Sequence, residues 1–305
     1  MTESLRISII IATYRREEVL CATLSQVLSE PYANKEVLVI DQTEKHTSET
    51  LKYLESVKHF IRYIHMDHPS VVEAENLGIR EATGDVVLFL DDDVSFEAGL
   101  IERHARNYAD ASVSGVTGLV LERGHSVVRR LNDVCWNTRF GYFFFRHDYA
   151  GRVRVSNVAE GNTSFRRRVL LDAGLFDERF RENAYLFGMD LAVRVARAGE
   201  KIVHDPKAGV LHLRAPTGGV RMKRVRPASY FRNLFYFLNK HMGRHERFAV
   251  AVRVFFYRVL AEGWRRPWTI PWKIRPFVKG WWVDRVTGER GRHRQGPEPV
   301  GRQNP

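Results

Sequence analysis

Residues 86–93 read Val-Val-Leu-Phe-Leu-Asp-Asp-Asp. Five apolar residues in a row predict a β-strand that is buried on both faces, as in a parallel sheet. Three carboxylates stand where that strand ends, and adjacent negative charges repel one another and lose hydration unless a cation is present. The stretch therefore predicts a cation site. Its alternative is a solvated acidic turn that caps a helix beginning near Glu97.

The nature of the cation follows from the ligands. Mg²⁺ and Mn²⁺ prefer oxygen ligands, and a metal that carries a diphosphate satisfies both the ion and the acids. Open α/β sheets bind their ligands outside the carboxyl ends of the strands, which is where this triplet falls. The expected cofactor is therefore Mn²⁺ or Mg²⁺.

Strands and helices alternate on the N-terminal side of this stretch. Apolar runs at 7–11, 36–40 and 61–64 predict strands, and helical spacing of apolar residues predicts helices around 20–28, at 47–57 and at 70–82. Thr13 is expected to cap the first helix, and Asp41 has the capping of the second as its alternative role. Such alternation predicts an α/β fold with a mostly parallel sheet and flanking helices.

The C-terminal side is less regular. Helices are expected at 97–108, 166–173 and 187–198, with strands at 113–121 and 210–213, and the segment 160–165 is expected to open a helix. Aromatic residues gather in the irregular segment 123–158, at Trp136, Phe140 and residues 142–145. They form either a satellite core or the wall of a sugar pocket.

Charge divides the chain into parts. The 305 residues carry a net charge of +12, but residues 221–305 hold 20 Lys and Arg against 5 Asp and Glu. We expect a domain at 1–220, a basic aromatic helical extension at 221–287 and a disordered tail at 288–305. Tryptophans beside cations at 264–268 and 281–282 favour an anionic membrane surface, since indole and Arg suit its interface. Nucleic acid is not the expected partner, because it leaves the acidic stretch unexplained.

The expected location follows from what the sequence lacks. Cys21 and Cys135 are the two cysteines, which make neither a disulfide framework nor a Cys-based metal site. No apolar run approaches the ~20 residues of a membrane-spanning helix, and the first residues lack the apolar core of a signal peptide. We expect a cytoplasmic protein, peripheral at the inner face of the cell membrane.

Seven segments in order resemble glycosyltransferase family 2, the inverting enzymes of the GT-A fold, over roughly Arg6 to Leu213. They are Ile7–Arg15, Val37–Asp41, Glu75–Gly78, Ala82–Asp85, Leu90–Asp93, the pair Gly161–Arg167 with Gly174–Glu178, and Asp190–Arg194, with His212 after the last core strand. The resemblance implies transfer of a sugar from a nucleoside diphosphate sugar, of UDP or dTDP type, to a hydroxyl. The expected acceptor is a glycan or a lipid-linked molecule.

The resemblance also implies the site residues. Those expected at the nucleotide are Thr13, Tyr14, Arg15, Asp41, Asn76, Asp91 and Asp92. Those expected at the metal are Asp91, Asp93 and His212, with Asp93 also counted as catalytic. Gly161 and Asn162 are expected near the acceptor or the donor sugar.

The general base is where the sequence departs from the family pattern. Relatives have Glu-Asp where this chain has Phe187-Gly188. Asp190 is our candidate base; Glu182 from the preceding loop, or a weak or inactive enzyme, is the alternative. Gln42 and Glu75 depart from the pattern too. A catalytically silent nucleotide-sugar-binding protein, or a transferase acting on a soluble natural product, is therefore the alternative function.

Overall fold

The computed structural model describes residues 5–130, 135–137, 143–219, 227–261 and 270–286. The chain forms two compact units, Met1–Val225 and Arg226–Pro305. The predictions for Phe140, for residues 264–268 and for the tail at 288–305 lie outside the described residues.

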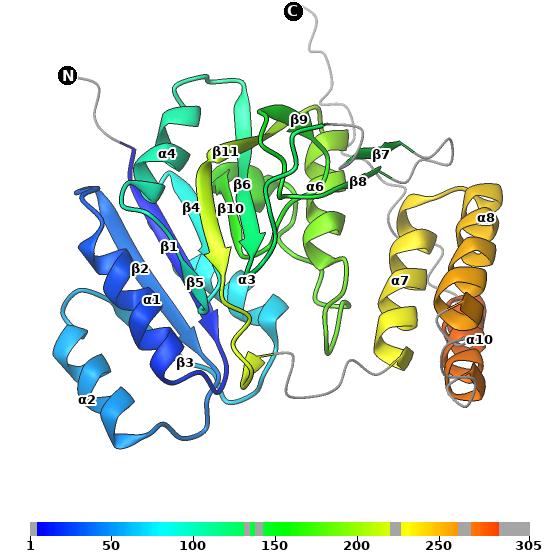
Figure 1. Ribbon diagram of the computed structural model, residues 1–305, viewed down its shortest axis with the longest axis horizontal. Helices are drawn as coiled ribbons and strands as arrows, with labels where there is room; N and C mark the ends of the chain where they lie inside the picture. Colours follow the sequence, from blue (N-terminus) through cyan, green and yellow to red (C-terminus); the bar gives the residue numbers. More distant parts are fainter. Residues whose placement is uncertain (1–4, 131–134, 138–142, 220–226, 262–269, 287–305) are drawn as a thin grey trace, which may run out of the picture. The chain divides into compact units, whose positions relative to one another are not determined.

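One large sheet forms the centre of the first unit (Figure 1). Its strands are β1 (Ile7–Thr13), β2 (Lys35–Asp41), β3 (Arg62–His65), β4 (Val86–Leu90), β5 (Val94–Ser95), β6 (Val113–Glu122), β9 (Val153–Val155), β10 (Asn162–Arg166) and β11 (Lys201–His212). Their order is β3-β2-β1-β4-β10-β6-β11-β5, with β9 beside β11. Neighbours run parallel, except that β10 is antiparallel to β4 and β6, and β5 and β9 are antiparallel to β11.

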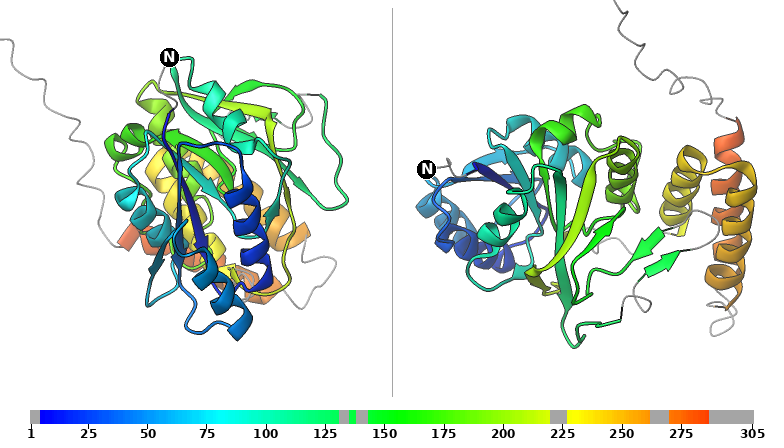
Figure 2. Two further views of the ribbon diagram at one scale, coloured as in Figure 1. Left: turned by 90° about the vertical axis from the view of Figure 1, so that its left-hand side faces the viewer. Right: turned by 90° about the horizontal axis from the view of Figure 1, so that it is seen from above.

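Helices cover both faces of this sheet (Figure 2). They are α1 (Glu18–Ser29), α2 (Ser48–Val57), α3 (Val71–Glu81), α4 (Leu100–Asn107), α5 (Arg167–Asp172) and α6 (Phe187–Arg197). Alternate residues of β1 face opposite ways: Ile9 joins a core cluster that includes Leu20 of α1, while Ile10 lies against Gly78 of α3. The predicted α/β fold with flanking helices is confirmed.

Helix starts follow from local sequence only in part. The side chains of Thr47 and Ser70 accept hydrogen bonds from the third residue of α2 and α3, as N-caps do. The expectation that Thr13 caps α1 is wrong, because Thr13 ends β1 and its hydroxyl donates to Asp92 at 2.7 Å. The alternative role of Asp41 as a cap is also wrong, since Thr47 fills that place.

Two segments differ from expectation near the site. Residues 162–166 form strand β10 between β4 and β6, although the sequence predicted that 160–165 opens a helix. The strand is favoured because both neighbours supply backbone partners and Phe165 is buried in the core. The strand expected at 210–213 is only the end of the longer β11. The aromatic segment contributes a small hairpin of β7 (Cys135–Asn137) and β8 (Phe143–Phe145).

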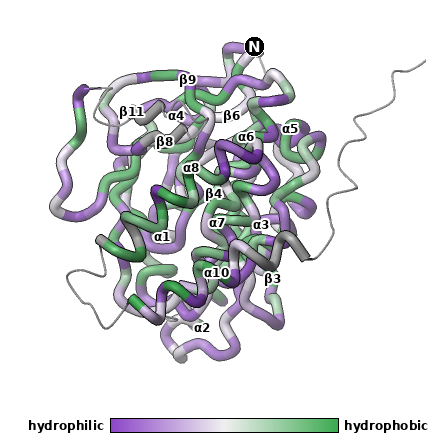
Figure 3. The backbone as a smooth tube through the Cα atoms, turned by 90° about the vertical axis from the view of Figure 1, so that its right-hand side faces the viewer, coloured by the Kyte–Doolittle hydropathy of each residue, from purple (hydrophilic) through white to green (hydrophobic). Residues whose placement is uncertain are grey.

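The second unit is helical, as predicted. It contains α7 (Pro227–His241), α8 (Arg244–Val254), a π-helical segment (Phe255–Ala261) and α10 (Ile270–Val286). The ring of Phe277 on α10 lies 5.3 and 5.2 Å from those of Phe231 and Phe235 on α7, in edge-to-face geometry. Polar and apolar residues are mixed along α8 (Figure 3). Within the described residues, no helix has both the length and the apolar character needed to span a bilayer.

Candidate active site

The acidic triplet lies at the edge where the strands of the sheet end. β4 pairs in parallel with β1, so Asp91 follows β4 close to the end of β1 at Thr13. β11 returns beside β5, which pairs His212 with Val94, and the Leu213 N–H donates to the Asp93 carbonyl at 2.8 Å. Residues about 120 positions apart in the sequence are therefore neighbours.

Asp91, Asp93 and His212 form one group, called here the metal cluster. One ligand atom from each lies within 4.8 Å of the other two. Nε2 of His212 is 3.1 Å from an oxygen of Asp93 and 3.6 Å from one of Asp91. Carboxylate oxygens suit Mg²⁺ and Mn²⁺, and an imidazole nitrogen adds a ligand that transition metals accept. The donor set fits a divalent metal, and the Asp91 side chain is 48% exposed to admit one.

Arg16 neutralises the buried side of the triplet. Its side chain is only 5% exposed and lies 3.5 Å from Asp92 and 3.3 Å from Asp93. A further contact runs from the guanidinium to the carbonyl of Ala215. Asp92 is turned inward, since its carboxylate also accepts from Thr13. Asp92 and Thr13 therefore back the cluster from inside the protein.

The two buried acids of the triplet differ in their surroundings. Burial raises the pKa of Asp92 to about 7, although Arg16 and the Thr13 hydroxyl oppose the shift. Burial pushes the pKa of Asp93 in the same direction, but His212, the Ala215 N–H and Arg16 together bring it below its ordinary value. Of these two acids, Asp93 is the one whose surroundings favour the ionised form.

Tyr14 and Arg15 form the turn after β1. The Arg15 guanidinium donates twice to the Glu44 carboxylate, at 2.8 Å each, and both side chains are about half exposed. This pairing lowers the pKa of Glu44 to about 2. The Tyr14 hydroxyl also donates to Glu44, and the Tyr14 carbonyl accepts from the Gly219 N–H at 2.7 Å. The turn thus places the half-exposed Arg15 guanidinium after β1, the strand that pairs with β4.

Three other predicted site residues are buried and bonded within the protein. Asp41 is fully buried and accepts from Tyr63 at 3.0 Å, with a His46 ring nitrogen at 2.6 Å. The Asn76 amide joins the Phe176 backbone and Glu178. The Asn162 amide donates to the carbonyls of Leu119 and Ala208. Their predicted ligand contacts stay predictions.

Gly161 allows the close approach of Asp91 to β10. A Cβ at this position would lie 2.0 Å from a carboxylate oxygen of Asp91, so the glycine leaves the space that the Asp91 carboxylate occupies. The Asp91 N–H also donates to the Gly161 carbonyl at 3.1 Å. Strand β10 therefore holds the exposed member of the metal cluster in place.

Comparison with known families shows the family of the chain. Residues 8–173 match the model described as Glycosyl transferase family 2. The chain belongs to glycosyltransferase family 2. This confirms the family that the sequence analysis inferred from its motifs.

Curated relatives extend the comparison. Poly-beta-1,6-N-acetyl-D-glucosamine synthase of Staphylococcus aureus (strain COL) is 25% identical over 224 residues, which are 72% of this chain and 53% of that protein. An uncharacterized glycosyltransferase of Rickettsia bellii (strain RML369-C) is 34% identical over 92 residues, or 30% of this chain and 13% of that one. The chain thus spans about half the length, or less, of these relatives.

Solved structures confirm the GT-A fold of this family 2 chain. The crystal structure of GalNAc-T7 with UDP, GalNAc and Mn²⁺ matches with a TM-score of 0.59 and 14% identity, over 77% of this chain and 48% of that one. The mannosyltransferase PcManGT from Pyrobaculum calidifontis, in complex with GDP-Man and Mn²⁺, matches with a TM-score of 0.57 and 17% identity, over 92% and 88%. At this level of identity the likeness concerns the fold alone.

Asp190, the candidate base of this family 2 chain, lies in the first turn of α6. Its carboxylate is fully buried and accepts from Arg194 at 2.9 Å. Arg194 in turn donates to the carbonyls of Ala173 and Leu175. Asp190 therefore anchors α6 to the preceding turn. The alternative base, Glu182, is exposed in a loop where its φ is +58°.

Sequence reasoning gave no role to a second pair of acids, called here the acid pair. Glu160 directly precedes Gly161, and one of its carboxylate oxygens accepts from the Gly188 N–H at 3.1 Å. Glu75 lies on α3, is 7% exposed, and its Oε2 is buried with no hydrogen-bond partner. Among the described residues neither carboxylate forms an ion pair. The departure from the family pattern at Glu75 was the one signal in the sequence.

The acid pair and the metal cluster share an electrostatic environment. The surrounding protein raises the pKa of Glu160 to about 7, and the charge of Asp91 adds to the rise while the Gly188 N–H opposes it. Burial raises the pKa of Glu75 well above its usual range, with Glu160 and then Asp91 adding to it. Glu160 is nevertheless open to solvent. It lies at the same edge of the sheet as Asp91, next to Gly161.

Proposed function

We propose that the protein transfers a sugar from a nucleoside diphosphate sugar to a hydroxyl group of an acceptor, with inversion at the anomeric carbon. The observation that carries the proposal is the metal cluster at the carboxyl edge of a family 2 sheet. Asp91, Asp93 and His212 would hold Mn²⁺ or Mg²⁺. When bound, such a metal acts as a Lewis acid that stabilises the charge developing on a diphosphate leaving group.

The chain's own residues would hold the rest of the donor. Arg15 is open and now pairs with Glu44, so a diphosphate can compete for its guanidinium with a bidentate contact. Tyr14 offers a ring beside it. Thr13, Asp41 and Asp92 lie at the ends of strands at this edge, and Asn76 is proposed at the nucleotide on the family resemblance alone. On the same resemblance we propose a UDP- or dTDP-type donor.

The acceptor is proposed from the relatives. One of them is named a synthase of poly-beta-1,6-N-acetyl-D-glucosamine, which supports a glycan or a lipid-linked glycan as acceptor. Gly161 lies against Asp91, and Asn162 pairs with Leu90 just before it, where we propose that an acceptor approaches the donor sugar. A soluble natural product is the alternative acceptor.

Calorimetry with UDP, dTDP and GDP tests the proposal, each nucleotide with and without Mn²⁺, on the parent and on Asp93→Ala. We expect one nucleotide to bind only with metal, and the variant to lose that binding. Asp67→Ala is the matched control, because the Asp67 side chain is fully exposed. Binding of no nucleotide would contradict the proposal, and binding without turnover would favour a silent nucleotide-sugar-binding protein.

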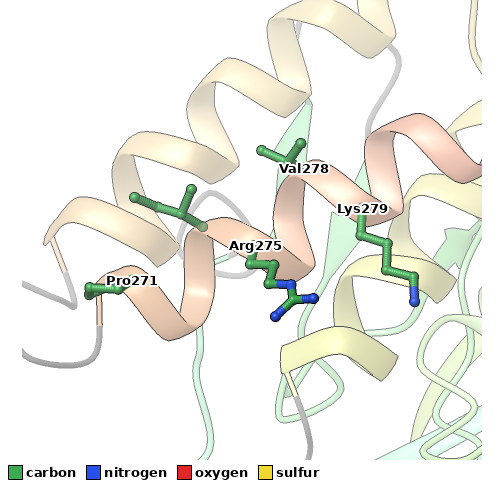
Figure 4. A pocket seen from close by; sticks show the side chains of 5 residues that line it. Pro271, Arg275, Val278 and Lys279 are labelled. Atoms are coloured by element: carbon green, nitrogen blue, oxygen red, sulfur yellow. The ribbon is translucent and has the colours of Figure 1, made fainter.

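We also propose that the second unit binds an anionic membrane surface. Trp272 is 79% exposed and Phe256 60% exposed. Pro271 and Val278 line a shallow hollow on α10 beside the cationic Arg275 and Lys279, and Ile274 completes it (Figure 4). Exposed indole and aliphatic groups next to cations match a lipid interface with negative headgroups.

Co-sedimentation with vesicles tests this attachment. We expect the full chain to bind vesicles that contain phosphatidylserine and to bind phosphatidylcholine alone more weakly. Trp272→Ala should release the protein, because an indole that inserts into the lipid interface contributes a large share of the binding free energy. Phe60→Ala, at an aromatic residue that is 70% exposed in the first unit, is the control. Equal binding of Trp272→Ala and the parent would exclude this surface.

A further inference from the structure

We propose that the Glu160 carboxylate is the general base that accepts the proton of the attacking hydroxyl. The inference rests on the proposed sugar transfer and assigns a step of it that the sequence left open. In that step the acceptor oxygen forms a bond to the anomeric carbon, and the bond from that carbon to the diphosphate oxygen breaks. The electron pair leaves with the nucleoside diphosphate, and the hydroxyl proton goes to Glu160 and then to water.

Position is the first reason. β10 is antiparallel to β4, so the start of β10 meets the end of β4, and Asn162 pairs with Leu90. Glu160 stands two residues before that pair, next to Gly161, whose backbone lies against the Asp91 carboxylate. The carboxylate of Glu160 is therefore on the same edge of the sheet as the metal cluster, where the anomeric carbon must be.

Accessibility is the second reason. A base has to reach the substrate, and Glu160 is exposed to solvent while Asp190 is fully buried and bonded to Arg194. Among the described residues Glu160 forms no ion pair, so no cation has to be displaced before it accepts a proton. Within the described part of the chain its carboxylate accepts one hydrogen bond, from the Gly188 N–H, which engages one oxygen and leaves the other for the acceptor.

The third reason is the space made by Gly188. A Cβ at position 188 would lie 2.5 Å from Cγ and 2.7 Å from an oxygen of Glu160. The Glu160 side chain thus occupies the space that a side chain at position 188 would need. Because Gly188 lies in the first turn of α6, the carboxylate also lies at the positive end of that helix. Position 188, where relatives have an acid, is thus occupied by the carboxylate of Glu160 from the segment that precedes β10.

The unpartnered Glu75 is an independent observation at the same place. Its Oε2 is buried and unpaired, and its charge interacts with Glu160 and with Asp91. Buried polar atoms in native proteins almost always have partners. Glu75 is therefore a second acid of this region whose carboxyl group lacks a complete set of partners among the described residues.

Glu160→Gln is the main test, because the amide keeps the shape and cannot take the proton. We expect metal-dependent nucleotide binding to persist while sugar transfer falls by at least about 100-fold, the lower range of general-base contributions. Transfer to water is measured as release of nucleoside diphosphate from a panel of UDP-, dTDP- and GDP-sugars, so the natural acceptor is not needed. Glu102→Gln, on the exposed side of α4, is the matched control.

Azide separates a base from a merely structural residue. Azide is already an anion and needs no deprotonation, so Glu160→Ala should form the glycosyl azide of inverted configuration although it no longer uses water. Transfer at the parent's rate in Glu160→Gln would overturn the assignment. So would a variant that uses neither water nor azide while still binding nucleotide and Mn²⁺. If the parent protein binds no nucleotide, the result would instead count against the proposed function.

Gly188→Ala provides a second variant that does not remove the carboxylate. Alanine is favoured over glycine within a helix by up to about 1 kcal/mol, so the fold should be at least as stable. The new methyl group must displace the Glu160 side chain, and we expect transfer to fall by about 10-fold, since small misplacement of a catalytic group is costly. Unchanged transfer in this variant would contradict the proposed position of the base.

Discussion

The metal cluster and the acid pair lie at one edge of the sheet and are built in opposite ways. In the metal cluster, Asp93 has His212 and Arg16 within 3.3 Å, so its charge is compensated before any ligand arrives. In the acid pair, Glu160 receives one backbone N–H and Glu75 has an unpartnered oxygen. The difference suggests a division of labour, with one group holding charge and the other holding or releasing a proton.

The largest expected effect comes from removing the cation behind the metal cluster. Arg16→Met keeps the side-chain volume but leaves Asp92 and Asp93 without their buried partner. We expect the free energy of unfolding to fall by about 3–5 kcal/mol, as for other broken buried ion pairs. Urea unfolding measures it, and Mn²⁺ should restore more stability to the variant than to the parent. Arg168→Met, at a side chain that is 82% exposed, is the control.

A smaller effect is expected at the paired acid of α6. Asp190→Asn removes one partner of a pair whose Arg194 is 21% exposed, so we expect a loss of about 2 kcal/mol in unfolding free energy. The folded variant should keep most of its transfer activity, unlike Glu160→Gln. Single-turnover rates of Asp190→Asn and Glu160→Gln decide which acid is the base. A greater rate loss in Asp190→Asn would favour Asp190, the base predicted from the sequence.

The smallest effect concerns the hydrogen bonds between the neutral His104 side chain of α4 and strand β10. His104 is buried, with its ring nitrogens 2.9 Å from Ser164 and 3.0 Å from Asn162. Burial lowers its pKa to about 4 from an ordinary 6.5, while Asn162 and Asp205 oppose the shift. The unfolded chain therefore takes up the proton first as pH falls, and the stability contributed by neutral His104 is lost between pH 6.5 and about 4.

His104→Gln isolates this contribution. Asp92 and Glu160 have raised pKa values, so they act in the opposite direction and are the same in both proteins. Between pH 7 and pH 5 the parent should lose about 2 kcal/mol relative to the variant, from the two pKa values of His104. Urea unfolding of both proteins at the two pH values gives the difference. A difference that does not change with pH would show that the pKa of His104 is not lowered in the folded protein.

Elements that depend on neighbours in the sequence were predictable. The apolar run 86–90 is strand β4, and the alternation before it gives β1, β2 and β3 with their helices, because periodicity reflects which side chains a helix or strand buries. Ser70, the first residue of the helix predicted at 70–82, is the N-cap of α3. The segment 160–165 was mistaken for the start of a helix because its strand partners, β4 and β6, are distant in sequence.

The site divides in the same way. The triplet Asp91–Asp93 could be read directly, and the family pattern added His212, which lies 3.1 Å from Asp93. That Asp92 turns inward was decided by Arg16 and Thr13, some 76 to 79 residues away. Asp190 is engaged by Arg194, and Arg194 is in turn held by two backbone carbonyls that precede α6. These contacts could not be read from the sequence.

The sequence by itself determined the fold class, the family and the position of the acidic edge, because strand and helix periodicity and short motifs are local properties of the chain. Only the tertiary structure decided which acids carry a compensating charge. Glu160 and Gly188 are 28 residues apart, and nothing between them predicts that one fills the space left by the other. A carboxylate's role depends on its exposure and its neighbours, which exist only once the strands are assembled.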